Sequence, residues 1–347
     1  MLGIDTVRAF APLVVLHPED QWRPTSVETY LKGCVIKDSN DPGFETAATE
    51  TAITAHTAAS YYLQQSDTSV AAGMPLEGET CAAPMYVHWR ESGDVIDVVY
   101  IFFYGFNGSQ AGYCHIKEDE VFKHHYKDRW FTWADFAQHE SDWEHVIVRL
   151  DKATLKPTWL RFARHGEADG EWAAWSDVEK REGEHPVVYS ALHSHGSYRD
   201  QRGPGQKEKY QPAAAYKFDS ALLAVVNSMP SGSVGWSFKE IVLADNTVEH
   251  VDHHSSAYWR PWTGPASLEP LQDQFWLAFQ GPWAPERDNG AHIHQPKPHL
   301  PGHLHEKLGE AAHVADFFGA LPSKYKHGGR PKGPSHQSWW STSPQLP

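Results

Sequence analysis

Short runs of alternating apolar and polar residues dominate the chain, and 26 glycines and 24 prolines separate them. This pattern is typical of many short strands and loops rather than of long helices. The stretches "APMYVHWRES" (83–92) and "DVIDVVYIFFYGFNG" (94–108) predict a β-hairpin whose turn is "ESGD". The second strand is apolar on both faces near "VVYIFFY", so we expect it to be central in its sheet.

Further strands are predicted at 138–150, in "PTWLRFARHG" and in "HPVVYSALHSHGSY", and "FAPLVVLHPED" predicts an edge strand. Ser26 is placed to cap a short helix. Residues 38–83 are rich in small residues and favour loops, although "TAITAHTAASYYL" fits a helix or a strand. We predict a mainly β protein, an antiparallel β-sandwich with long decorated loops and a few short helices. Its sandwich domain is expected over 1–290 with an insertion at 108–138, and a partly disordered His-, Pro- and Gly-rich extension at 291–347.

Composition narrows the classes of partner. The 347 residues carry a formal charge of −14, which disfavours nucleic acid and anionic lipid surfaces. No apolar run is long enough to span a bilayer, and the first twenty residues read as mature structure rather than a signal peptide. The three cysteines lack metal-ligand spacing and favour a reducing compartment, so we expect a cytoplasmic protein, with one disulfide still open.

In the predicted strand at 138–150, "QHESDWEHVIVRL", one face begins with polar residues and continues with apolar residues that we expect in the core. Side chains alternate along a strand, so Asp142 and Glu144 share a face with Val146, Val148 and Leu150. Two carboxylates on one face repel each other and are costly to bury. They could lie in water at the mouth of the strand, pair with Arg or Lys, or share a divalent cation.

A second strand ends in the same way. In "VVYSALHSHGSY" the alternation puts one row on a single face, namely Val187, Tyr189, Ala191, His193 and His195. If the two strands are neighbours, imidazoles and carboxylates meet at one rim of the sandwich and could hold a divalent cation. An oxygen-rich set favours Mg²⁺, Ca²⁺ or Mn²⁺, whereas more histidine favours Zn²⁺ or Fe²⁺. The alternative is that the carboxylates cap the strand and make solvated ion pairs.

These residues carry a resemblance to a known family. "HESDWEHVIVRL" with "YSALHSHGSY" resembles the vacuolar protein sorting-associated protein 62 family of fungi, plants and bacteria. "APLVVLHPEDQWRPTSVETYL", "VVYIFFYGFNG" and "FWLAFQGPWA" match it in the same order, and the resemblance spans about residues 9 to 290.

The Asp-Trp-Glu and Ser-x-His-Gly motifs are also similar to those of the necrosis- and ethylene-inducing peptide-like toxins. That resemblance implies a β-sandwich with a divalent cation at its rim. By motif it implies roles in the metal site for His139, Asp142, Glu144 and His195, with Asn107 near a further ligand position. Ser141 stands where those toxins usually have glycine, and the toxins are secreted and rely on a disulfide. We therefore carry over the metal site and not the toxicity.

Other candidate residues have plainer explanations. Trp143 and His145 fall on the opposite strand face, where a packed indole and a hydrogen-bonded imidazole are the simplest roles. "VDHHSSAYW" (Asp252, His253, His254) and "AHIHQPKPHLPGHLH" could bind metal, but the second is too proline-rich to hold ligands in place. "HHYKDRW" could form a lid or a surface loop. No phosphate-binding glycine loop, Gly-x-Ser-x-Gly or His-Glu-x-x-His motif is present.

Three functions fit these observations. The first is a divalent-metal-dependent enzyme acting on a small apolar molecule by hydrolysis, elimination or cyclisation. Asp142, Glu144, His195 and Asn107 would hold the ion, and His139 or His193 would carry protons. The aromatic residues Tyr104, Phe106, Trp130 and Trp133 would line its pocket. The second, the alternative to an enzyme, is a protein that uses the metal to bind a neutral lipid or glycan headgroup and is linked to membrane trafficking or toxin-like recognition. The third is an interaction scaffold whose cation is structural.

Overall fold

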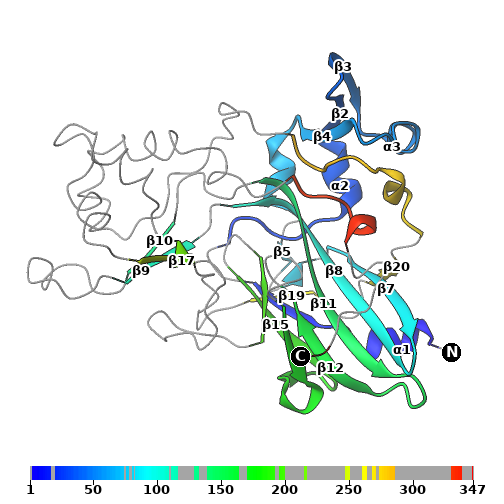
Figure 1. Cartoon of the computed structure of the whole chain (residues 1–347), viewed down its shortest axis with the longest axis vertical. Helices are drawn as coiled ribbons and strands as arrows, with labels where there is room; N and C mark the ends of the chain where they lie inside the picture. The colour runs from blue at the N-terminus through cyan, green and yellow to red at the C-terminus, as the bar shows by residue number, and fades with distance from the viewer. Residues whose placement is uncertain are drawn as a thin grey trace, which may run out of the picture.

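The computed structural model describes residues 2–16, 20–73, 76–77, 80–81, 83–108, 111–115, 129–132, 139–163, 170–191, 195–199, 215–216, 247–250, 260–263, 268–270, 273–285, 330–337 and 346. Two β-sheets packed face to face form its centre (Figure 1).

The larger sheet has six strands in the order β13-β12-β11-β8-β7-β20. Its strands are β7 (Met85–Ser92), β8 (Val95–Asn107), β11 (His139–Asp151), β12 (Pro157–Phe162), β13 (Glu171–Ala174) and β20 (Leu268–Pro270). All its pairs are antiparallel except β20 with β7. The long strands β8 and β11 pair from Val95 with Asp151 to Asn107 with His139, so the polar end of β11 lies beside the end of the apolar strand β8.

The second sheet has five strands, in the order β14-β15-β1-β19 with β16 paired to β15. They are β1 (Leu13–Leu16), β14 (Lys180–Arg181), β15 (His185–Ser190), β16 (Ser197–Tyr198) and β19 (Arg260–Thr263). β1 and β15 run parallel. Val14 and Val188 from this sheet share one buried cluster with Val98 and Val148 from the larger sheet, and this cluster is the core of the sandwich.

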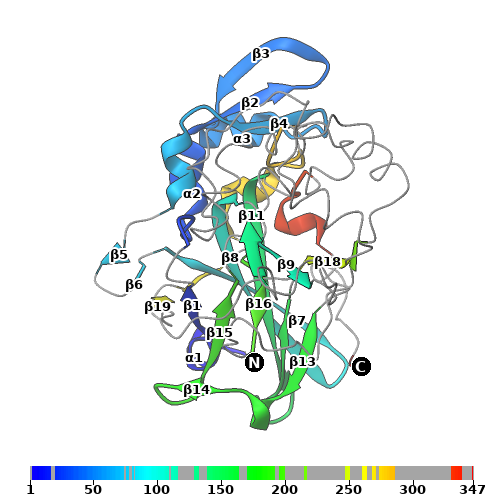
Figure 2. The ribbon, with the colours of Figure 1, turned by 90° about the vertical axis from the view of Figure 1, so that its left-hand side faces the viewer.

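A second core covers the opposite face of the larger sheet. It is rich in rings, and Phe103 packs there with Trp143, Trp276 and Trp283. Over it lie α2 (Val27–Lys32), α3 (Glu50–Ala55) and a small sheet of β2 (Cys34–Asp38), β3 (Asp41–Ala47) and β4 (Tyr61–Gln65) in the order β3-β2-β4. Figure 2 shows this small sheet and α3 at one end of the molecule, beyond the ends of β8 and β11.

The other helices and strands are short. They are α1 (Ile4–Ala9), η1 (Thr68–Ala72), β5 (Leu76–Glu77), β6 (Thr80–Cys81), β9 (Ala111–His115), β10 (Arg129–Thr132), η2 (Trp175–Asp177), β17 (Ala215–Tyr216), β18 (Thr247–His250), η5 (Phe275–Ala278) and η6 (Pro334–His336). Near the C-terminus, residues 330–337 return to the ring-rich core. The amide of Trp283 donates to the carbonyl of Pro331 at 2.8 Å, and the Arg330 guanidinium donates to the carbonyl of Ala284 at 3.0 Å.

The predicted fold class is confirmed: the chain is mainly β, largely antiparallel, with few short helices. The hairpin is confirmed, since Ser92 pairs with Val95, and β8 is central between β11 and β7. Ser26 caps α2, and its hydroxyl accepts a hydrogen bond from the amide of Thr29 at 3.0 Å. No helix among the described residues is long and apolar enough to cross a membrane.

Two predictions of the local structure were wrong. β1 is not an edge strand, because β15 and β19 pair with it on either side. Residues 38–83 are not mainly loop, because β3, α3, β4 and η1 lie within them. Thr49 explains one of these elements: its hydroxyl accepts from the amide of Ala52 at 3.2 Å and starts α3. The domain limits at 290 and 291 stay predictions.

Candidate functional site

The row of carboxylates and core residues on β11 faces the inside of the sandwich. Val146, Val148 and Leu150 belong to the sandwich core, and Asp142 and Glu144 precede them on the same row. Both carboxylate residues are buried, at 8% and 9% exposure. The strand therefore carries two acidic groups into the end of the core, as the alternation predicts.

Ser141 has a left-handed backbone, with φ of 56° just before Asp142. The conformation disturbs the alternation of side chains: the Ser141 hydroxyl donates to the carbonyl of Trp283, while Glu140 beside it accepts from the amide of Gln65. Only glycine adopts positive φ without strain.

His195 reaches the site by a turn and not along a strand. β15 ends at Ser190, and the amide of His195 donates to the carbonyl of Ala191 at 3.1 Å, which turns the chain back. His195 itself has a φ of 55°. The predicted row is confirmed for Val187, Tyr189 and Ala191, which share one cluster with Val15. It does not extend to His195 along a strand, because β15 ends at Ser190, and it is the even-numbered Val188 that faces the sandwich core.

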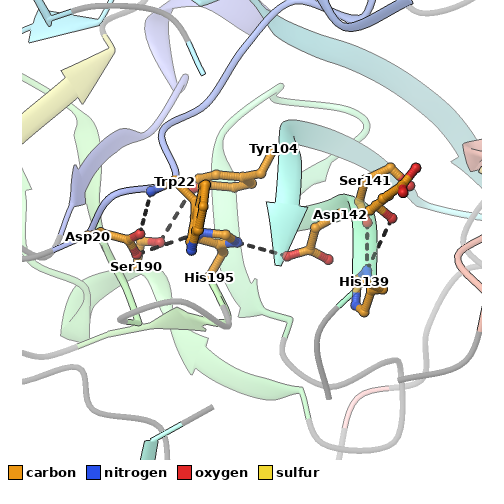
Figure 3. A network of polar contacts seen from close by, with 9 residues as sticks. Asp20, Trp22, Tyr104, His139, Ser141, Asp142, Ser190 and His195 are labelled. Atoms are coloured by element: carbon orange, nitrogen blue, oxygen red, sulfur yellow. Dashed lines mark hydrogen bonds and ion pairs between the residues drawn. The ribbon is translucent and has the colours of Figure 1, made fainter. Parts of the chain in front are cut away.

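The turn places His195 between two carboxylates (Figure 3). Its Nδ1 lies 2.9 Å from Oδ2 of Asp142, and its Nε2 lies 3.6 Å from Oδ2 of Asp20. The imidazole stacks on the ring of Tyr104, with 3.7 Å between centroids and 6° between planes. Tyr104 is paired with Asp142 across β8 and β11, so the sheet register sets the position of both partners. The Tyr104 hydroxyl lies 3.3 Å from that of Ser190.

Burial and the neighbouring carboxylates shift the pKa values of His195 and Tyr104. Burial alone would lower the pKa of His195, but the carboxylates of Asp20 and Asp142 outweigh it and raise the pKa from 6.5 to about 9. Burial also raises the pKa of the Tyr104 hydroxyl well above its ordinary value, and the negative charges of Asp20, Glu144 and Asp142 raise it further. Three carboxylates therefore act on the ionisation of one tyrosine hydroxyl.

Asp20 was missed by the sequence analysis. It lies in the segment between β1 and α2, and its side chain is 1% exposed. Its Oδ1 accepts a hydrogen bond from the amide of Trp22 at 2.9 Å. A short acidic loop residue gives no periodic signal. The resemblance of "APLVVLHPEDQW" to the family was the one sequence observation that included it.

Of the other predicted site residues, the structure describes Asn107 and His139 but not His193. Asn107 is buried and pairs in register with His139 at the end of the two strands. His139 donates its Nδ1 hydrogen to the carbonyl of Ser141 at 2.7 Å. His193 lies outside the described residues, as do the side chains of Trp130 and Trp133 and the clusters at 252–254 and 292–305.

No ready-formed group of three or more His, Cys, Asp and Glu ligands occurs within the described part of the chain. Asp20, His195 and Asp142 form a line rather than a convergent set. The predicted metal site of Asp142, Glu144, His195 and Asn107 therefore stays a prediction, as does the choice of metal.

The opposite face of β11 has a different character. Trp143 packs in the ring-rich core, as expected. His145 is 6% exposed; burial, helped by the charge of Arg161, lowers its pKa to about 3. His145 is therefore neutral at physiological pH, whereas His195 carries a proton in the absence of another cation.

Several solved structures are similar to this chain. Necrosis and Ethylene inducing Protein 2 from the causal agent of cocoa's Witches Broom disease is 16% identical, with a TM-score of 0.29 over 65% of this chain and 81% of its own. NLPPya in complex with mannosamine is 15% identical, with a TM-score of 0.28 over 70% and 88%. At such TM-scores these likenesses transfer neither ligand nor mechanism.

Sequence comparison gives a clearer result. No curated protein matches the chain. The family model for vacuolar protein sorting-associated protein 62 matches residues 4–207. The matched segment includes β8, β11 and all three members of the Asp20–His195–Asp142 group. Since it covers more than half of the 347 residues, the chain belongs to the vacuolar protein sorting-associated protein 62 family.

Proposed function

We propose that the rim around His195 binds a divalent cation and that the protein is a cation-dependent enzyme acting on a small apolar molecule. The observation that carries this proposal is the state of the His195 Nε2 atom. It is buried, makes no hydrogen bond, and faces a carboxylate oxygen of Asp20 at 3.6 Å.

The hydrogen bond to Asp142 sets the tautomer of His195. A carboxylate oxygen accepts, so Nδ1 carries the hydrogen, and a neutral imidazole then has its lone pair on Nε2. A lone pair facing a carboxylate oxygen is unfavourable unless a positive charge lies between them. Either a proton or a metal ion supplies that charge. A carboxylate behind the other ring nitrogen is the arrangement by which proteins orient metal-binding histidines.

Negative charge gathers at this rim, because Asp20, Glu144 and Asp142 all act electrostatically on the hydroxyl of Tyr104. A divalent ion beside a neutral imidazole would bring more positive charge to the rim than an imidazolium does. Mg²⁺, Ca²⁺ and Mn²⁺ suit this oxygen-rich surrounding, and Mg²⁺ commonly binds through one or two carboxylates with water in its other positions.

The residues of this chain would then have separable tasks. When bound, the cation would supply Lewis acidity or a bound water of lowered pKa. Asp142 holds the proton on Nδ1 of His195, and the Tyr104 ring fixes the plane of the imidazole. His139 keeps its Nδ1 hydrogen on the Ser141 carbonyl, which makes Nε2 its basic nitrogen for proton transfer. The rings of Trp22 and Phe106, 4.7 Å apart, supply apolar surroundings.

Metal analysis tests the first half of the proposal. The full chain, purified without chelator, is analysed for bound elements and then titrated calorimetrically with Mg²⁺, Ca²⁺ and Mn²⁺. We expect about one ion per chain and weaker binding in Asp142→Asn. Asp151→Asn, at the far end of the same strand, is the control and should bind as the wild type does. Absence of binding in the wild-type protein would overturn the proposal.

Turnover tests the second half. A cell extract of small apolar molecules is incubated with the cation-loaded protein, and mass spectrometry compares it with a sample containing Asp142→Asn. We expect one compound to disappear and a product to form only with the wild-type protein and only without chelator. Retention of the protein on neutral lipid vesicles or immobilised glycans, with no compound consumed, would replace the enzyme by the headgroup-binding alternative.

A further inference from the structure

We infer that Asp20 is the carboxylate ligand of the proposed cation and that Asp142 is a positioning residue, which acts on the ion only through His195. This inference rests on the proposed function and assigns roles within the same site. It changes the ligand set that the sequence motif predicts, because the motif places Asp142 on the ion and does not include Asp20.

The two ring nitrogens of His195 divide the roles. Nδ1 and Nε2 point away from each other, so one ion cannot bind to both. Nδ1 is occupied by Asp142 at 2.9 Å. Nε2 is the buried atom without a hydrogen bond, and the carboxylate it faces is that of Asp20. An ion on Nε2 therefore lies on the Asp20 side of the ring.

The separation of the two atoms suits a shared ion. Adjacent donor atoms bound to one ion at about 2.0–2.6 Å, with an angle of about 90° between the bonds, lie about 2.8–3.7 Å from each other. Nε2 of His195 and Oδ2 of Asp20 are 3.6 Å apart, which is too long for a good hydrogen bond and within the range for neighbouring ligands.

Asp20 is held in place for this role. Its Oδ1 accepts the Trp22 amide hydrogen, which turns Oδ2 towards His195. Two further contacts fix the segment that carries it. The amide of Thr25 donates to the carbonyl of Phe103 at 2.9 Å, and Pro24 forms a β-bridge with Tyr104. The carboxylate is thus oriented by backbone contacts before any ion binds, as is usual for protein ligands of metals.

The two assignments predict different losses of affinity. Asp20→Asn removes a ligand charge and should abolish or nearly abolish cation binding. Asp142→Asn retains an oxygen that can accept from Nδ1, so it should weaken binding by about 10- to 100-fold, as expected for a residue behind the ligand. Asp20→Glu, which keeps the charge, should retain part of the affinity.

The experiment measures the affinity of the full chain for Mn²⁺, Mg²⁺ and Ca²⁺ by calorimetry in the wild type, Asp20→Asn, Asp20→Glu, Asp142→Asn and the control Asp151→Asn. Near-ultraviolet circular dichroism in chelator checks that each variant is folded. Pulsed electron paramagnetic resonance of the bound Mn²⁺ detects imidazole nitrogen directly. We expect this signal in the wild type and in Asp142→Asn.

The outcomes separate the two proposals. Wild-type protein that binds no cation overturns the proposed function itself. Wild-type binding with unchanged affinity in a folded Asp20→Asn overturns the role of Asp20 and leaves the proposed function standing. A larger loss in Asp142→Asn than in Asp20→Asn reverses the two roles, which also overturns the inference. If Asp20→Asn does not fold, the affinity of Asp20→Glu decides, since unchanged binding there is incompatible with a ligand held so closely.

Discussion

Raising the pH of the metal-free protein should weaken its folding through His195. The folded pKa of about 9 lies above the ordinary value of 6.5. The unfolded chain therefore binds fewer protons at this residue than the folded protein between these values, and stability falls as the pH rises. The contribution is complete below pH 6.5 and is lost as the pH passes through 9.

The size of the effect follows from the same two values. Each tenfold difference in proton affinity is worth about 1.4 kcal/mol, so the full contribution of His195 is about 3 kcal/mol. About half of it should be lost by pH 8. The imidazole is fully buried, so solvent does not screen its two carboxylate partners. A saturating divalent cation should replace the proton and flatten this dependence.

Urea unfolding in chelator at pH 6, 7, 8 and 9, followed by tryptophan fluorescence, measures the loss. Asp142→Asn serves as the comparison, because groups elsewhere titrate equally in both proteins and cancel in the difference. We expect the wild type to lose more unfolding free energy than Asp142→Asn over this range. Equal losses in the two proteins would show that the paired carboxylates do not hold a proton on His195, and the electrostatic reasoning would be refuted.

Three other predictions concern residues outside this group. Asp97→Ala should lower the free energy of unfolding in urea by about 3–5 kcal/mol, because Asp97 accepts two hydrogen bonds, at 2.7 and 2.9 Å, from the buried guanidinium of Arg149. Replacing Asp97 by leucine together with Arg149 by methionine should recover much of that free energy. A small effect of Asp97→Ala alone would contradict the role of this ion pair. Ser141→Val should be less stable than Ser141→Gly by about 1–3 kcal/mol, since φ is positive there; equal urea midpoints would exclude backbone strain. Burial raises the pKa of the Cys34 thiol, so iodoacetamide at pH 8 should label it only after unfolding; rapid labelling of the native protein would disprove this.

The parts of the fold that the sequence predicts are those with local signals. The hairpin of β7 and β8 follows from alternation around a short turn, and the central place of β8 follows from its two apolar faces. Asp142 and Glu144 were placed correctly because a strand repeats every two residues. Alternation and turn residues can be recognised without knowing which distant segments a strand contacts in the folded protein.

The errors came from contacts that alternation does not encode. β1 looks like an edge strand in the sequence, but it pairs in parallel with β15, more than 150 residues later. His195 meets Asp142 through a turn with a positive φ, and the predicted strand row would have required regular backbone up to Gly196. Asp20 enters the site from a segment without periodicity, so the alternation of side chains gave no signal for it.

Residues 330–337 pack against Trp283, so a fragment chosen for expression should extend to this segment. A fragment limited to the family match at 4–207 would omit Trp276 and Trp283. The face of the six-stranded sheet that these two indoles cover in the ring-rich core would then be exposed to water. Such a truncated product should aggregate when expressed, because the segment recognisable by homology is shorter than the cooperative unit that excludes water.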